Sequence, residues 1–252
     1  MKIFGLLGYP IGHSFSKPFF EKKFIDLNLK DCRFKLFEHK KVKDFFQTIE
    51  VDYSIVGFSV TSPHKEQIIP FLNQLDDDAM QIGAVNCVKV IKQDKRKIYI
   101  GYNTDSYGFQ QSVKPFLEPL HERALILGTG GAAKAVAFAL KKIGIPSWFV
   151  SRNPDSKKSM SNLFSYHDMG QDIISAFKLI INTTPSEMLF GPESYPKIQY
   201  DAITCEHLCI DLIYQPNQTE FLFKSKQQGA NTMNGLDMLY AQAEKAWVIW
   251  NE

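Results

Sequence analysis

The stretch that most constrains the fold is residues 124–135, an apolar run followed by a glycine turn and an alanine-rich run. Residues 124–127 predict a buried strand, and the alanines that follow favour a helix. Gly128, Gly130 and Ala133 stand in G-x-G-x-x-A register, a spacing that permits a tight turn and a close approach of the backbone to a pyrophosphate. The stretch therefore predicts a dinucleotide-binding corner, with an ordinary tight turn as the alternative.

The overall composition is that of a globular chain with no extreme charge. Its 252 residues are 44% hydrophobic, enough for one large domain or two small ones. A net charge of +2 without a dense Lys/Arg tract argues against a nucleic-acid partner. The start of the chain has no signal-peptide pattern, and no apolar run approaches the roughly 18 residues of a membrane span. We therefore expect a soluble cytoplasmic protein without a membrane partner, its four cysteines being free thiols.

Three possible metal ligands lie close together near residue 207. Cys205, His207 and Cys209 alternate at period two, which would place them on one face of a strand. Zinc would need a fourth ligand, and the apolar residues on both sides favour a buried strand. We expect core packing here and no metal site, with zinc as the alternative.

The first hundred residues alternate between strand and helix patterns. Strands are expected at 2–7, 33–37 and 54–60, and helices at about 17–29 and 42–49, an alternation that predicts a parallel sheet. Ser62 and Pro63 predict a further helix to about Leu72, with Lys65 in its first turn, where the helix dipole disfavours a cation. A hairpin, with strands at about 87–91 and 97–101, then closes the first domain.

The rest of the chain predicts a second α/β domain. Helices are expected at 104–117, 131–143, 219–228 and 234–247, and strands at 123–127, 147–150, 178–181 and 209–213. An NAD site would place Asp or Glu after the second of these strands, whereas this chain has Ser151, Arg152 and Asn153 there, with Lys157 and Lys158 close behind. Arg152 favours the 2′-phosphate of NADP, although an ordinary surface arginine is the alternative.

Taken together, these loops resemble those of the shikimate dehydrogenase family, over essentially the whole chain. The matching segments are Ser14-Phe15-Ser16, Ser59 to Lys65, Gly83 to Cys87, Asn103 to Gly108, Gly128 to Ala132, Ser151 to Asn153, Asn182 to Pro185, Asp211 to Tyr214 with Pro216, and Asn234 to Gln242. The resemblance implies an α/β protein with a mainly parallel substrate domain at 1–104, completed by a returning C-terminal helix at 235–252. It also implies a Rossmann-type, doubly wound NADP domain at 105–234.

The resemblance also implies the residues of the site. Lys65 and Asp105 would be the catalytic pair, with Lys65 protonating the forming alkoxide and Asp105 orienting the lysine. The implied substrate-binding residues are Ser14, Ser16, Ser59, Thr61, Asn86, Tyr214 and Gln242. The implied cofactor-binding residues are Gly128, Gly130, Gly131, Ala132, Ser151, Arg152, Asn153, Thr183, Gly235 and Met238. No metal is required.

The implied activity is reversible, NADP-dependent hydride transfer between shikimate and 3-dehydroshikimate, in a monomer or homodimer. Ser59 stands where the family has Asn, and a hydroxyl reaches less far than an amide. This departure keeps open a relative that acts on quinate or on an aminated shikimate analogue. A non-catalytic nucleotide-binding regulator of the same fold is a further alternative, against which the presence of both Lys65 and Asp105 speaks.

Overall fold

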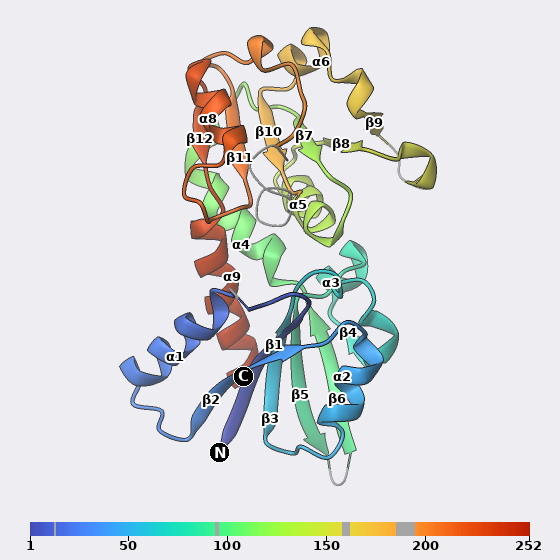
Figure 1. The fold of residues 1–252 in the computed structure, drawn as a ribbon, viewed down its shortest axis with the longest axis vertical. Helices are drawn as coiled ribbons and strands as arrows, with labels where there is room; N and C mark the ends of the chain where they lie inside the picture. The colour runs from blue at the N-terminus through green and yellow to red at the C-terminus, as the bar shows by residue number, and fades with distance from the viewer. Residues whose placement is uncertain (13, 94–95, 158–161, 185–194) are drawn as a thin grey trace. The chain divides into compact units, whose positions relative to one another are not determined.

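The chain forms two compact units. The computed structural model describes residues 1–12, 14–93, 96–157, 162–184 and 195–252. One unit is Met1–Thr104 with Ala243–Glu252, and the other is Asp105–Gln242, so residues 235–242 lie in the second unit. Each unit is built on its own six-stranded sheet (Figure 1). In the described part of the chain, no helix combines the length and the apolar character needed to cross a membrane.

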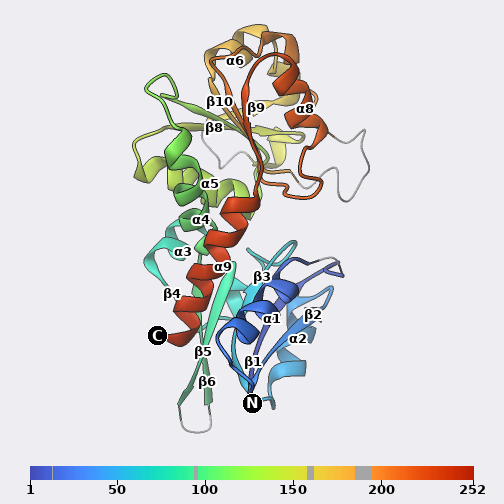
Figure 2. The same ribbon diagram turned by 90° about the vertical axis from the view of Figure 1, so that its left-hand side faces the viewer.

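The sheet of the first unit is mixed, in the order β2-β1-β3-β5-β6-β4. Its strands are β1 (Lys2–Gly8), β2 (Cys32–Glu38), β3 (Ile55–Val60), β4 (Gln74–Leu75), β5 (Cys87–Gln93) and β6 (Arg96–Tyr102). β1 pairs in parallel with β2 and β3, as the alternating pattern predicts. β5 runs antiparallel to β3 and to β6, forming the expected hairpin (Figure 2), whose turn at 94–95 lies outside the described residues.

Helices cover both faces of this sheet. Neighbouring residues of β1 point to opposite sides and are buried on both, so each face needs a covering layer. The helices are α1 (Ser16–Asp26), α2 (Val42–Ile49), α3 (Asp77–Ile82) and the end of α9 (Leu236–Asn251). On one face, Phe45 of α2 packs edge-on against Phe58 of β3. On the other face, Phe4 of β1 contacts Phe24 of α1 and Trp250 of α9. The last ten residues of the chain therefore supply part of the first unit's core.

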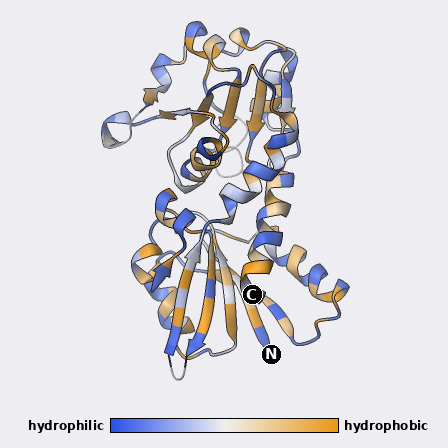
Figure 3. Cartoon of the chain, turned by 180° about the vertical axis from the view of Figure 1, so that it is seen from behind, coloured by the Kyte–Doolittle hydropathy of each residue, from blue (hydrophilic) through white to orange (hydrophobic). Residues whose placement is uncertain are grey.

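The sheet of the second unit is entirely parallel, in the order β12-β11-β10-β7-β8-β9. Its strands are β7 (Ala124–Leu127), β8 (Ser147–Ser151), β9 (Leu163–Ser165), β10 (Leu179–Asn182), β11 (Leu208–Asp211) and β12 (Asn231–Met233). This is the doubly wound Rossmann order, with the chain reversing direction across the sheet between β7 and β10. The central strands β7, β10 and β11 are wholly buried and strongly hydrophobic (Figure 3), as expected for strands covered on both faces.

The helices of the second unit complete its two outer layers. They are α4 (Thr104–Val113), α5 (Gly131–Lys142), α6 (Gln171–Ala176), α8 (Glu220–Gln227) and the first turns of α9. Phe109 of α4, Val136 of α5 and Met238 of α9 share one core cluster, whereas Ile174 of α6 and Phe221 of α8 belong to the cluster on the other face. The α/β class and the Rossmann-type domain expected from the sequence are thus confirmed. Short 3₁₀ helices lie at Ile69–Phe71, Lys114–Phe116, Pro154–Lys157, Tyr166–Asp168 and Tyr200–Ala202.

Candidate functional site

Lys65 lies in a turn, and the helix expected from Pro63 to Leu72 is wrong. The segment forms successive turns, with only a short 3₁₀ helix at Ile69–Phe71. Pro70 has no N–H to donate to the carbonyl four residues earlier, which prevents an α-helix from continuing through it. Because no α-helix begins here, the argument from a helix dipole does not apply to Lys65.

A buried histidine holds this turn in place. His64 is completely buried, and its ring contacts the His39 carbonyl at 2.7 Å and Gln67 Oε1 at 3.2 Å. The next residue, Lys65, is half-buried, and its carbonyl accepts a bond of 2.8 Å from the Val85 N–H. Lys65 is therefore fixed beside the segment that leads into β5. Sequence reasoning did not identify His64, since its partner lies 25 residues away.

Several predicted substrate residues of the first unit lie at the ends of neighbouring strands. Thr61 follows β3, and its N–H donates to the Leu7 carbonyl of β1 at 2.8 Å. Asn86 precedes β5, and its carbonyl accepts from Val60 of β3 at 2.7 Å. Ser59 is buried within β3, opposite Cys87. The strand pairing thus brings Ser59, Thr61 and Asn86 to one end of the sheet.

The loop after β1 carries two further predicted residues. Ser14 is half-buried, and its hydroxyl oxygen accepts from the Ser16 N–H at 3.2 Å. Ser16 is the first residue of α1 and is 8% exposed. His13, beside them, lies outside the described residues.

Asn86 also binds the start of α4. Its side-chain oxygen accepts from the Thr104 N–H at 2.6 Å, and its amide nitrogen donates to Thr104 Oγ1 at 3.0 Å. The two residues are buried and lie in the first unit. Asp105 follows immediately as the first residue of the second unit and is 5% exposed.

The first turns of α4 lie against α9 within the second unit. A Cβ on Gly108 would come within 2.6 Å of the Met238 carbonyl oxygen and 3.0 Å of the Gln242 backbone nitrogen. Asp105 lies one turn before Gly108 on α4. This helix packs against the turn of α9 that bears Gln242. The Met238 side chain is 7% exposed and belongs to the apolar core, and Tyr214 is half-buried after β11.

The predicted dinucleotide turn has the backbone that its glycines suggest. Gly128 has a φ of +117°, which disfavours any other residue, and a Cβ there would lie 2.6 Å from Thr183 Oγ1. Gly130 is the N-cap of α5 and offers no side chain, and the first turn, which holds Gly131 and Ala132, contains no acid. The N–H groups at this helix end are therefore available to an anion.

Thr183 and Gly235 lie on two further loops at this edge of the Rossmann sheet. Thr183 follows β10, and its hydroxyl donates to the Leu127 carbonyl of β7 at 2.8 Å. Gly235 is closely packed, because a Cβ on it would lie 2.1 Å from the Leu212 carbonyl oxygen. The structure therefore brings Thr183 to the glycine turn and places Gly235 against the loop after β11. Pro185, at the end of the Asn182 segment, lies outside the described residues.

The segment after β8 presents a positive charge. Ser151 is buried, and its hydroxyl oxygen accepts from the Asn153 N–H at 3.1 Å. Arg152 and Asn153 are exposed. Burial raises the pKa of Tyr166 to about 12, and the charge of Arg152 acts against that rise, which places the guanidinium near this phenol. Lys158 lies outside the described residues.

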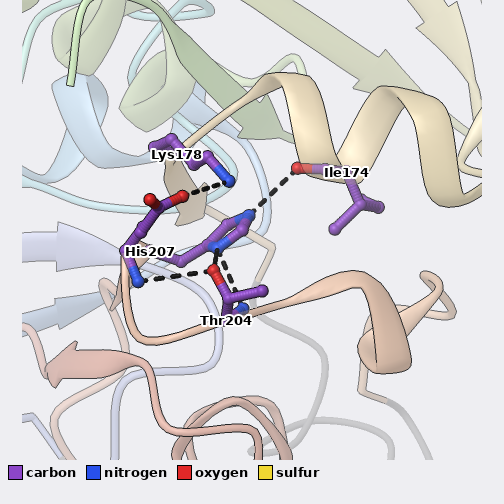
Figure 4. Close-up of polar contacts among 5 residues, drawn as sticks. Ile174, Lys178, Thr204 and His207 are labelled. Carbon is purple, nitrogen blue, oxygen red and sulfur yellow. Dashed lines mark hydrogen bonds and ion pairs between the residues drawn. The ribbon is translucent and has the colours of Figure 1, made fainter. Parts of the chain in front are cut away.

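Cys205, His207 and Cys209 do not lie on one face of a strand, so the expected alternation along a strand is wrong. Cys205 is exposed in the turn before β11, His207 follows that turn, and Cys209 alone lies in the strand. His207 Nδ1 accepts from the Thr204 N–H at 3.0 Å and Nε2 donates to the Ile174 carbonyl at 3.1 Å, with the Lys178–Glu206 ion pair alongside (Figure 4). His207 thus serves the core. Among the described residues, no group of three or more His, Cys, Asp or Glu side chains could hold a metal ion.

Comparisons with known proteins find relatives over nearly the full length of the chain. Residues 6–88 match the model of the shikimate dehydrogenase substrate binding domain. The shikimate dehydrogenase (NADP(+)) of Methanosphaera stadtmanae is 36% identical, over 98% of this chain and 90% of the relative.

Solved structures give the same result. The Aquifex aeolicus shikimate dehydrogenase structure has a TM-score of 0.85 and 33% identity, covering 100% of this chain and 92% of the other. The Thermus thermophilus shikimate 5-dehydrogenase in complex with NADP(H) and shikimate has a TM-score of 0.84 and 29% identity, covering 99% and 93%. From its fold, its loops and these similarities, the chain belongs to the shikimate dehydrogenase family.

Proposed function

We propose that this chain is an NADP-dependent shikimate dehydrogenase, an oxidoreductase that interconverts shikimate and 3-dehydroshikimate. The observation that carries the proposal is full-length similarity at 36% identity to a relative named shikimate dehydrogenase (NADP(+)), over 98% of the chain. The similar Thermus thermophilus structure contains both NADP(H) and shikimate. The substrate is therefore a small hydroxylated ring acid.

The turn at the start of α5 fits the pyrophosphate of a dinucleotide. The positive φ of Gly128 brings the backbone close to Thr183, and a Cβ added at Gly130 would meet open space. Gly131 and Ala132 begin an uncapped helix whose dipole favours an anion. These residues, with Thr183, Gly235 and Met238, are the proposed cofactor site, and NADP bound there supplies or accepts the hydride.

Lys65 is the proposed proton donor to the ring oxygen when the ketone is reduced, and it accepts that proton in the reverse direction. Lys65 is half-buried in a turn fixed by His64, so its position is defined before substrate binds. Asp105 is the proposed second member of the catalytic pair, and its buried position at the start of α4 suits a fixed carboxylate. The proposed ligands of the ring hydroxyls and carboxylate are Ser14, Ser16, Ser59, Thr61, Asn86, Tyr214 and Gln242.

The preference for NADP rests on the segment Ser151, Arg152 and Asn153. Arg152 is exposed after β8, where a carboxylate would instead favour the ribose hydroxyls of NAD. A guanidinium can bind the 2′-phosphate through charge-assisted hydrogen bonds.

A substrate and cofactor panel on the purified protein tests the proposal. We expect oxidation of shikimate with NADP, followed by nicotinamide absorbance, to exceed the other three combinations of shikimate or quinate with NADP or NAD. Ser59, buried in β3 where the family has Asn, is the reason to include quinate. Activity on quinate with NAD alone would contradict the proposal and favour the alternative dehydrogenase. No turnover despite dinucleotide binding would favour a regulator.

The assembly and the compartment stay predictions. We propose a cytoplasmic protein, because three of the four free cysteines are buried thiols, a state that a reducing compartment maintains. The proposed assembly is a monomer or homodimer. Light scattering coupled to size-exclusion chromatography measures the assembly.

A further inference from the structure

Asp211 is a fully buried carboxyl group at the end of β11, directly before the loop that bears Tyr214. It has no exposed surface. Its Oδ1 accepts from Asn182 Nδ2 at 3.1 Å and from the Ile213 N–H at 3.0 Å. Its Oδ2 accepts from Asn182 Nδ2 at 3.1 Å and from Thr219 Oγ1 at 2.7 Å. A buried carboxyl group is costly unless its acceptors are satisfied, and here each oxygen receives at least two bonds.

The donors come from three different segments of the second unit. Asn182 ends β10, Ile213 lies in the loop after β11, and Thr219 is the N-cap of α8. The Thr219 hydroxyl oxygen also accepts from the Leu222 N–H at 3.3 Å, so one side chain ties Asp211 to the helix start. A single carboxyl group thus joins segments that are separate in sequence.

Asn182 extends the connection to the glycine turn. Its side-chain oxygen accepts from Thr184 N–H at 3.1 Å and from Thr184 Oγ1 at 2.7 Å. Thr183, held between these residues, donates from its N–H and hydroxyl to the Leu127 carbonyl at 3.0 and 2.8 Å. The Asp211 carboxyl group therefore fixes Asn182, and through it the loop that places Thr183 beside Gly128.

The bond to Ile213 orients the second loop. Asp211 Oδ1 and the Ile213 N–H close a turn of the Asx type, which sets the direction of the chain into Tyr214. The Ile213 carbonyl in turn accepts from the Gly235 N–H at 3.1 Å. The same carboxyl group therefore orients the loop with Tyr214 and the approach of Gly235.

We propose that Asp211 is a positioning residue for the reaction, holding Thr183 and Gly235 for the dinucleotide and Tyr214 for the substrate. The inference rests on the proposed function for the identity of both ligands. Apolar side chains could fill this part of the core, but they could not fix the positions of three segments, because they form no directional hydrogen bonds. Small errors in position are costly, because a displacement of about 1 Å can reduce a rate by about a hundredfold.

The primary test replaces Asp211 with Asn in the full chain. Whichever oxygen it replaces, an amide nitrogen cannot accept a hydrogen bond, so residue 211 loses one bond to Asn182 and the bond to either Ile213 or Thr219, while volume is conserved. We expect kcat/KM to fall about 10- to 100-fold, with higher KM values for both NADP and shikimate. NADP binding measured by calorimetry should weaken. Hydrogen exchange should become faster in peptides covering residues 182–184 and 212–214.

The matched control is Ile180→Val, which removes one buried methylene from the neighbouring strand β10 without touching these loops. Ile180→Val is assayed well below its Tm. Even if its Tm falls as much as that of Asp211→Asn, both KM values and loop exchange should stay unchanged. Thr219→Val, which deletes one donor, and Thr219→Ser, which keeps it, form a second pair if Asp211→Asn does not fold. The serine should restore the kinetics that the valine loses.

The outcomes separate the two proposals. If Asp211→Asn matches Ile180→Val in KM, dinucleotide affinity and loop exchange, the positioning role is wrong. If wild-type protein does not oxidise shikimate, the proposed function fails instead. Dinucleotide affinity and exchange at residues 182–184 and 212–214 then still decide the role of Asp211.

Discussion

At the scale of single residues, Lys65 is the residue whose change should affect turnover most. Lys65→Met keeps the length of the side chain and removes its proton. We expect kcat to fall by about 10²- to 10⁴-fold, the usual contribution of one positioned acid or base. The KM for shikimate should change much less, because the lost interaction is needed mainly in the transition state. Steady-state kinetics on the purified variant measure both quantities.

Lys43→Met is the matched control, since Lys43 is an exposed lysine of the same unit, on α2. It should leave both kinetic constants unchanged. Near-normal turnover in Lys65→Met would show that Lys65 is not the proton donor.

The charge at Arg152 should decide between the two cofactors. Arg152→Ala removes a contact that only the 2′-phosphate can use. Hydrogen bonds to charged groups contribute about 1.5–3 kcal/mol, so the KM for NADP should rise roughly 10- to 100-fold while that for NAD stays nearly constant. Kinetics with both cofactors, and with the exposed Lys141→Ala as control, measure this. Equal losses for both cofactors would make Arg152 a structural residue.

At the scale of elements, two buried histidines make the second unit sensitive to acid. Burial lowers the pKa of His121, which faces the Glu118 carboxylate and bonds to the Glu206 backbone, and burial also lowers the pKa of His207, which faces Lys178 and Glu206. In each ring Nδ1 accepts a backbone N–H bond, from Glu118 at 2.9 Å and from Thr204 at 3.0 Å, which protonation would break. Folding therefore favours the neutral rings.

The sign of the pH effect follows from these lowered values. The unfolded chain holds a proton on each ring below about pH 6.5, whereas the folded chain does not until the pH falls further. The stabilisation that the two neutral rings contribute is therefore complete above that pH. On acidification the free energy of unfolding decreases, by at most about 1.4 kcal/mol per pH unit for each histidine. Urea unfolding between pH 7 and 5 measures this slope.

Variants isolate the contribution of the two rings. His121→Gln with His207→Gln should flatten the slope, because glutamine does not titrate. His167→Gln changes an exposed ring and should leave it unaltered. A double variant with the wild-type slope would contradict this explanation.

The sequence predicts elements well where burial and periodicity coincide. The apolar run of β7 and the alanines of α5 carry clear signals, and both elements form where expected. Short elements such as α6 and β9 were not predicted, since three to six residues carry no clear period and depend on packing. Pro63 is a helix start signal and predicts a helix at Lys65, whereas Pro70 and the contact of His64 with His39 produce a turn there.

The site is partly visible in the sequence for a similar reason. The backbone at Gly128 has a positive φ that favours glycine, so a local sequence motif can identify this residue. Asp211 and Thr104 act through partners on other segments, and those partners become known only when the strands are paired.

At the scale of the whole chain, the last residues complete the first unit. Trp250 is 3% exposed, packs against Phe4 and Phe20, and donates from its indole N–H to the Val88 carbonyl at 3.0 Å. It lies over Gly57, where a Cβ would come within 2.2 Å of the indole ring. The first unit therefore lacks part of its core until residues 243–252 are in place.

Trp250→Ala should destabilise the first unit selectively. Removing a large buried aromatic ring costs about 3–5 kcal/mol, and the loss of its hydrogen bond to the Val88 carbonyl adds to this cost. Hydrogen exchange should accelerate in peptides from β1, β3 and β5, and much less in peptides from β7 and β10, because the cavity opens in the first unit's core. Val248→Ala, on the same helix but 44% exposed, should change neither set. Equal acceleration in all five strands would mean that the two units unfold as one, and unchanged exchange in β1 and β3 would show that the end of the chain is dispensable to the first unit.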